Sequence, residues 1–277
     1  MSALDLTALA TGITPDPDGY WTAAASPVSY PEGGNDECFA IEESSFWFRH
    51  RNRAILTLLQ TFPFPSGPLL DVGGGNGVVT KAMQDAGFSA VLLEPGRGGV
   101  RNALARGVAN VICGDVAGVG LRPRSFGAIG LFDVLEHLEN DVAFLRALTP
   151  ALRAGGRVYA SVPAFQALWS NEDDEAGHFR RYRRPTLRAA MEAAGLRVDF
   201  LTYIFWPLPL PILLFRALPS RFGRRNEPSA DRHRGEHEVE SVLARKGLDA
   251  MLSPELALIR ARRAIPFGAS LLAVATV

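Results

Sequence analysis

The stretch LLDVGGGNG at residues 69–77 constrains most strongly what this chain can fold into. An apolar run at 68–72 ends in a glycine-dense turn, and a segment compatible with a helix follows at 78–86. The order of strand, tight turn and helix is the first half of a nucleotide-binding βαβ unit. Glycines permit a sharp turn and close approach of a ligand, and the first helical turn offers unpaired N–H groups.

Within this turn the spacing is D-x-G-x-G-x-G, made by Asp71, Gly73, Gly75 and Gly77. A dinucleotide-binding fingerprint would place its third small residue where Val78 stands. A carboxylate two residues before the glycines does not stabilise a bound pyrophosphate, but it attracts an ammonium group. The pattern therefore favours a nucleoside with a zwitterionic amino-acid tail over a nicotinamide dinucleotide.

Acids also follow the next predicted strands, at the carboxyl ends where parallel α/β sheets bind ligands. Glu94 ends the second strand, and a carboxylate there suits a ribose diol because it accepts two hydroxyl hydrogen bonds. Asp115 follows the third strand and is placed to accept from an adenine amino group. Asp133 follows the fourth strand and extends the series.

Apolar runs alternate with helical segments along the chain, so the expected fold is α/β with a doubly wound sheet. Strands are expected at 68–72, 89–93, 110–113, 127–132, 157–162, 197–203 and 269–277. Helices are expected at 39–60, 78–86, 141–153, 185–194 and 236–263, with Gly155-Gly156 as the C-cap of the third. The chain divides into an N-terminal segment with a capping helix (1–60), a nucleoside-binding core (61–203), a hydrophobic and helical insertion (204–265) and a final strand (266–277).

Composition limits the partners and the compartment. The chain has 29 basic and 29 acidic residues, and this neutral balance argues against a general nucleic-acid binder. Cys38 and Cys113 fit neither a disulfide framework nor a zinc spacing. The N-terminus lacks the basic and apolar regions of a signal peptide. We therefore expect a cytoplasmic protein that does not bind nucleic acid.

Taken together, these motifs resemble the class I S-adenosylmethionine-dependent methyltransferases. The matching pieces are DVGGGNG (71–77), Glu94, Gly114-Asp115, DVLEH (133–137) and LRAGG (152–156). The pieces VPA (162–164), LWS (168–170) and GHFRRY (177–182) are similar to a bacterial subgroup related to the ubiquinone-type, or type 11-like, methyltransferases. Gly74 and Asn76 depart from the usual loop residues, but both are small.

The resemblance implies a Rossmann-like sheet of seven strands with an antiparallel last strand, and S-adenosylmethionine as the cofactor. It places Asp71 near the ammonium group of the cofactor, Glu94 at the ribose and Asp115 at the adenine. The cofactor-binding residues that we expect are Asp71, Gly73, Gly75, Gly77, Glu94, Asp115 and Asp133.

Methyl transfer requires alignment of donor and acceptor, and it needs a base only when the acceptor must lose a proton. The candidate bases are His137, after the fourth strand, and His178, in a polar loop at 170–184. For each histidine, the alternative is a purely structural role. We favour His178. Candidate acceptor contacts are Trp47, Arg180, Arg181 and Tyr182. For the last three, the alternative interpretation is a charged run that is exposed to solvent. Asp173 and Asp174 have no further ligands to complete a set, so no metal is expected.

The segment at 201–215 has no charged residue and is interrupted by three prolines, so it is too short and too broken to cross a membrane. Two interpretations stay open. The segment forms a strand followed by an apolar cap on the acceptor pocket, or residues 201–225 touch a lipid-linked substrate or the inner face of a membrane.

The expected function is transfer of a methyl group to a small or lipid-like acceptor, with oxygen preferred over nitrogen or carbon as the receiving atom. One alternative is an NAD(P)-dependent oxidoreductase, against which Asp71, Gly77 and Asp115 argue. The other is a non-catalytic nucleoside-binding module of the same fold.

Overall fold

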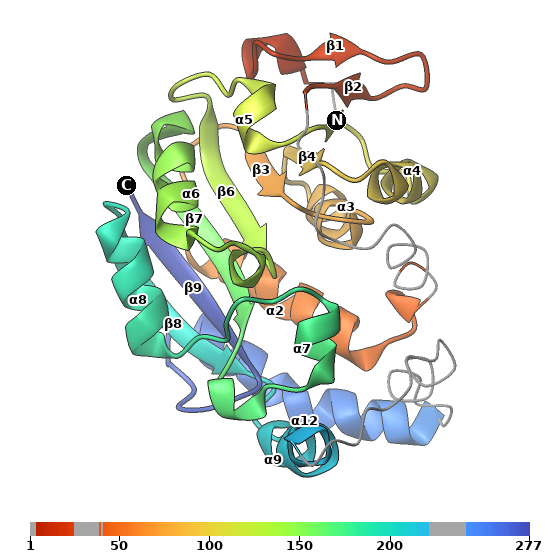
Figure 1. Cartoon of the computed structure of the whole chain (residues 1–277), viewed down its shortest axis with the longest axis vertical. Helices are drawn as coiled ribbons and strands as arrows, with labels where there is room; N and C mark the ends of the chain where they lie inside the picture. The colour runs from red at the N-terminus through yellow and green to blue at the C-terminus, as the bar shows by residue number, and fades with distance from the viewer. Residues whose placement is uncertain (1–3, 25–38, 40, 222–241) are drawn as a thin grey trace.

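The computed structural model describes residues 4–24, 39, 41–221 and 242–277, without the side chains of 242–246 (Figure 1). Cys38 and the first part of the helix expected at 236–263 lie outside the described residues. The strands are β1 (Thr14–Pro15), β2 (Trp21–Thr22), β3 (Leu69–Val72), β4 (Ala90–Glu94), β5 (Val111–Cys113), β6 (Phe126–Phe132), β7 (Leu152–Pro163), β8 (Arg197–Ile204) and β9 (Ser270–Thr276).

These strands form one mixed sheet in the order β1-β2-β5-β4-β3-β6-β7-β9-β8. The described part of the chain thus has nine strands in its sheet rather than the expected seven. The extra two are the hairpin β1–β2, whose second strand pairs in parallel with β5. Each hairpin strand has two residues, which is too few to show a periodic pattern in the sequence. The last strand, β9, is antiparallel to both β7 and β8, as the resemblance implies.

Helices cover both faces of the sheet (Figure 1). On one face lie α2 (Phe46–Thr61), α3 (Val78–Asp85) and α12 (Val242–Arg260), and on the other lie α6 (Asp141–Leu148) and α8 (Arg184–Ala193). Adjacent strand residues alternate between the two layers, so that Leu69 packs under α2 and Leu70 under α6 and α8. Burial on both faces explains why the central strands are continuously apolar.

Shorter helices complete the described chain. They are α4 (Arg97–Ala105), α5 (Val116–Val119), α7 (Asn171–Glu175), α9 (Pro209–Ile212), the π-helical turn η5 (Leu213–Ala217), α10 (Leu218–Arg221) and the 3₁₀ turns η1 (Leu6–Ala8), η2 (Leu135–His137), η3 (Thr149–Ala151) and η4 (Gln166–Leu168). The prolines at 207, 209 and 211 do not prevent a helical segment here, because Pro209 and Pro211 fall within the first turn of α9.

Three expected boundaries were wrong. The helix expected at 141–153 ends at Leu148, and Gly155-Gly156 is no C-cap, because it lies inside β7 where the pairing with β6 shifts register. The helix expected at 39–60 is interrupted: Phe39 and Ile41 are helical, a turn follows at 42–44, and α2 begins at Phe46, where the Ser45 hydroxyl caps it by accepting from the Trp47 N–H. The loop expected at 170–184 contains α7, which a capping box begins.

Candidate active site

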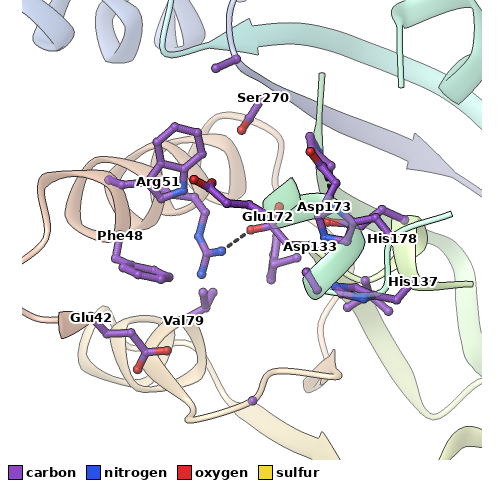
Figure 2. A pocket seen from close by; sticks show the side chains of 18 of the residues that line it. Glu42, Phe48, Arg51, Val79, Asp133, His137, Glu172, Asp173, His178 and Ser270 are labelled. Atoms are coloured by element: carbon purple, nitrogen blue, oxygen red, sulfur yellow. Dashed lines mark hydrogen bonds and ion pairs between the residues drawn. The ribbon is translucent and has the colours of Figure 1, made fainter. Parts of the chain in front are cut away.

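A cavity of about 740 Å³ opens at the carboxyl ends of the central strands. Its walls come from α2, the glycine loop at 73–77, the ends of β4 and β6, α7 and the segment after β8. Figure 2 shows side chains from these distant segments converging on it. We call the side formed by the glycine loop, Asp71 and Glu94 the cofactor wall. The remainder, from α2, residues 133–137, α7 with His178 and Arg181, and residues 208–216, is the acceptor wall.

In the glycine loop, Gly73 and Gly75 present bare backbone to the cavity, whereas Gly77 does not line it and packs closely against Ala103 and Val108. Gly73, Gly75 and Gly77 have φ angles of 66°, 54° and 71°, in the left-handed region that residues with a Cβ rarely adopt. A Cβ added to Gly75 would meet no atom within 4 Å, so that position faces open space. A ligand can therefore approach the chain at Gly75 more closely than any side chain would allow.

Asp71 is fully buried at the base of the cofactor wall. Its Oδ2 accepts a hydrogen bond from the Thr80 hydroxyl at 2.6 Å, whereas Oδ1 has no partner among the described residues. Burial raises the pKa of Asp71 to about 7, although the Thr80 hydrogen bond acts in the opposite direction. A buried acceptor without a donor is energetically unfavourable, and a ligand ammonium group would supply that donor. This side chain therefore fits the cofactor that the resemblance implies.

Glu94 supports the glycine loop and also lines the cavity. Its two carboxylate oxygens accept from the backbone N–H of Gly75 at 2.9 Å and of Gly96 at 2.7 Å. Burial raises the pKa of Glu94 in spite of these bonds. Each oxygen keeps capacity for a second hydrogen bond, which is what a ribose diol requires.

The two remaining acids of the series differ in position. Asp115 does not line the cavity; its carboxylate caps α5 by accepting from the Gly118 N–H at 2.7 Å, so the geometry gives no support to its expected contact with adenine. Asp133 does line the cavity. It accepts from the Ser161 hydroxyl at 2.9 Å and forms an ion pair with Arg51 of α2 (Figure 2).

The two candidate bases lie together on the acceptor wall. The rings of His137 and His178 meet edge to face, with centroids 4.7 Å apart (Figure 2). His178 Nδ1 lies 2.8 Å from Asp173 Oδ1, so it donates to that carboxylate and leaves Nε2 as the basic ring atom. The sequence predicted both positions but not the Asp173 partner.

Asp173 is itself fixed by several donors. It is 1% exposed and accepts from Arg181 Nε at 2.7 Å, from Arg181 Nη2 at 2.9 Å and from the Ser170 N–H at 2.9 Å. Burial acts to raise the pKa of Asp173, but the bonds from His178 and Arg181 outweigh it and hold the pKa below its usual value. The carboxylate is therefore ionised and orients His178.

The pKa values of two neighbouring groups are shifted towards their uncharged forms. Burial, with His178 adding to it, lowers the pKa of His137 to about 4. Burial also raises the pKa of Glu136 well above its usual value, and the nearby charge of Asp133 adds to that rise. Both side chains line the cavity.

Only half of the candidate acceptor contacts line the cavity. Trp47 does so while stacking on Phe205 with centroids 4.0 Å apart. Arg181 also lines it, but its guanidinium group is bound to Asp173, so it does not offer an unengaged cation to an anionic acceptor.

The expected roles of Arg180 and Tyr182 need correction, because neither lines the cavity. Arg180 pairs with Asp141 at 3.2 Å, and the buried Tyr182 hydroxyl donates to the same carboxylate at 2.6 Å. Alternation along an extended segment turns these two side chains away from the side on which Arg181 lies. They hold the start of α6 in place.

Apolar side chains make up much of the acceptor wall, and the sequence did not identify them individually. They are Phe46 and Phe48 of α2 and Leu208, Pro211, Ile212 and Phe215 after β8. The signals in the sequence that could have identified them are the three adjacent aromatics at 46–48 and the uncharged run at 201–215. Arg216 binds Glu172 of α7 at 2.6 Å, and both residues line the cavity. No described helix is both long and apolar enough to span a membrane.

A doubly wound sheet with this cavity at its carboxyl edge defines a class of α/β proteins that bind a nucleoside cofactor. The sequence model of a family described as "Methyltransferase domain" matches residues 47–200. The chain belongs to this family and, with it, to the class I S-adenosylmethionine-dependent methyltransferases, whose methyl donor is S-adenosylmethionine. No curated protein sequence matches the chain. The ubiquinone-type subgroup stays a prediction.

Solved structures share the fold at low sequence identity. A Haloferax volcanii methyltransferase, solved with the Trm112 methyltransferase activator, is 18% identical with a TM-score of 0.56, and the match covers 90% of this chain and 99% of that one. Phosphoethanolamine N-methyltransferase 2 of Haemonchus contortus, solved with S-adenosylmethionine, is 16% identical with a TM-score of 0.54, and the match covers 90% of this chain and 58% of that one. A Thermotoga maritima S-adenosylmethionine-dependent methyltransferase is 17% identical with a TM-score of 0.53, covering 88% and 99%. These similarities show the fold and leave the acceptor unassigned.

Proposed function

We propose that the protein transfers the methyl group of S-adenosylmethionine to a hydroxyl oxygen of an apolar, lipid-like acceptor. The observation that carries this proposal is that the cofactor wall and a histidine-bearing apolar wall face the same cavity. S-adenosylmethionine supplies a methyl group that is already electrophilic. The protein then has to align the two reactants, exclude water and handle one proton.

On the cofactor wall, Asp71 Oδ1 would bind the ammonium group, and the bare backbone at Gly75 would lie against the methionine part. Glu94 would accept from the ribose hydroxyls. The orphaned Oδ1 atom and the open space at Gly75 support these roles. Asp133 would contribute indirectly, since its carboxylate is already engaged by Arg51 and Ser161.

On the acceptor wall, His178 Nε2 would take the hydroxyl proton as the acceptor oxygen bonds to the methyl carbon. The carbon–sulfur bond breaks in the same displacement, and the sulfur keeps its electron pair. Asp173 is a positioning residue, because it orients the His178 ring and stabilises the imidazolium that forms. The proton leaves to solvent after product release.

The acceptor class follows from the apolar surface that runs into the cavity from outside. Phe215 lines the cavity and is also 74% exposed, and Leu210 beside it is 63% exposed. Trp206 and Leu214 of the same segment are also exposed apolar side chains, at 41% and 46%. Such a patch on a monomer marks a contact site, and its continuity with the cavity supports delivery of an acceptor from a membrane surface.

The test is single-turnover methylation with labelled S-adenosylmethionine, using lipid extracts and aqueous metabolite extracts as separate acceptor pools. With a hydroxyl acceptor, His178→Ala should lower the rate by ~10²–10⁴-fold while the affinity for S-adenosylhomocysteine stays nearly unchanged. Label found only in aqueous products would contradict the lipid-like acceptor. Wild-type rates in both His178→Ala and His137→Ala would show that transfer works by alignment alone.

A further inference from the structure

We infer that Glu136, His137 and His178 form a binding site for one divalent transition-metal ion on the acceptor wall. One carboxylate oxygen and one nitrogen from each ring lie within 4.8 Å of one another. Two imidazoles and one carboxylate are a ligand set for Zn²⁺ or Fe²⁺ that leaves coordination positions for a substrate oxygen. The three residues line the cavity, so those positions face the acceptor.

Glu136 gives the first independent reason. Its side chain is 1% exposed, and Oε2 has no hydrogen-bond partner among the described residues. An unsatisfied buried acceptor destabilises a fold. A cation at this point would supply the missing partner for that oxygen.

The second reason is how the histidines are held. In metal sites, a ligating histidine donates its other ring N–H to a carboxylate or to a backbone carbonyl. His178 donates to Asp173, which two bonds from Arg181 fix. His137 has a hydrogen bond to the backbone of Ala176. Each ring is thus held by a hydrogen-bond partner other than the three proposed ligands.

This site differs from the one that the sequence led us to reject. Asp173 and Asp174 were considered as ligands, whereas the fold uses Asp173 to orient a ligand and engages Asp174 with the Trp169 indole N–H at 3.0 Å. The consequence for catalysis rests on the proposed function. A bound ion would lower the pKa of a coordinated acceptor hydroxyl, and the proton would pass to solvent instead of to His178. Metal binding itself does not depend on that function.

The experiment is calorimetric titration of the chelator-treated full chain with ZnCl₂, in parallel with Co²⁺ titration followed by its visible absorption. One ion should bind per chain, with a Co²⁺ spectrum typical of nitrogen and oxygen ligands. Glu136→Gln and His178→Ala should each weaken binding by at least ~100-fold, and Asp173→Asn by ~10–100-fold. Retained affinity for S-adenosylhomocysteine identifies the variants that are folded.

The matched control is the double variant His233→Ala/His237→Ala, which changes two histidines outside the described residues. Unchanged Zn²⁺ affinity in this control, with loss in the other variants, supports the site. No stoichiometric Zn²⁺ binding by the wild type, or binding lost only in the control, would overturn it. Neither result decides whether the wild-type protein methylates an acceptor from the lipid extract, so the two proposals fail separately; Zn²⁺ binding would assign the effect of His178→Ala to loss of a ligand rather than of a base.

Discussion

The cofactor wall and the acceptor wall of the cavity are built in opposite ways. The cofactor wall comes from one stretch of chain, 71–94, and consists of glycine backbone and two carboxylates held by neighbouring groups. The acceptor wall joins α2, residues 133–137, α7 and the insertion through side-chain pairs such as Arg51–Asp133 and Arg216–Glu172. The difference teaches that, under the proposed function, cofactor recognition would be a local property of this chain, while acceptor recognition would depend on long-range contacts. Substitutions should therefore be able to disrupt one wall of the cavity and leave the other intact.

The largest effect is expected at Glu255, which anchors α12 beside the acceptor wall. It is 1% exposed and accepts from His50 Nε2 at 2.7 Å and from the N–H groups of Phe205 at 3.0 Å and Trp206 at 2.7 Å. Glu255→Ala leaves all three donors without this partner, two of them in buried positions, so the free energy of unfolding should fall by about 3–5 kcal/mol.

Urea denaturation measures this change, and the matched control is Glu192→Ala. Glu192 forms an exposed i,i+4 pair with Arg188, and losing that pair should cost less than about 0.5 kcal/mol. Folded Glu255→Ala protein should still bind S-adenosylhomocysteine. Equal destabilisation by the two variants would show that the buried carboxylate does not hold the acceptor wall together.

The next effect concerns the backbone of the cofactor wall. In Gly75→Val a branched side chain would fill the open space at the loop, so affinity for S-adenosylhomocysteine should fall at least ~100-fold, or about 2.7 kcal/mol. Because φ at Gly75 is 54°, valine also adds strain. Gly87→Val controls for strain, since Gly87 has φ of 90° with open space around its Cβ position, outside the cavity. Similar affinities in both variants, measured by calorimetry, would place the cofactor elsewhere.

A smaller effect is expected at Glu94. Glu94→Ala removes the acceptor for the ribose and the partner of the Gly75 N–H, so binding of S-adenosylmethionine should weaken by ~1–3 kcal/mol. Glu94→Gln keeps one oxygen acceptor and should lose less. Calorimetry on folded Glu94→Ala with unchanged affinity would disprove the ribose assignment.

The smallest effect is a dependence of affinity on pH. The pKa of Asp71 is about 7, and only its ionised form pairs with an ammonium group. Affinity should therefore rise as the pH rises through 7 and should fall by up to ~tenfold per pH unit below it. Calorimetric titrations with S-adenosylhomocysteine across this range check the slope. Asp71→Asn should bind weakly at every pH and lose this slope; a slope that persists in the variant would point to another group.

The sequence by itself determined the parts whose physics is local. The spacing of Asp71 and the glycines follows from a turn that needs left-handed backbone, and the strands follow from continuous apolar runs buried on both faces. The same reasoning located His137 and His178 at the carboxyl edge of the sheet. Family membership and the cofactor followed from these elements, because each is encoded within one βα unit or at one strand end.

Only the tertiary structure decided which side chains meet. Arg51 and Asp133 are 82 positions apart in the chain, and His50 and Glu255 are 205 apart, so no spacing could have paired them. The unpartnered oxygen of Glu136 likewise became visible only once burial was known. Arg180 and Arg181 are neighbours in sequence, yet Arg180 binds Asp141 and Arg181 lines the cavity. Their side chains point to opposite sides of the segment, and only the packing of the segment in the fold decides which side faces the cavity.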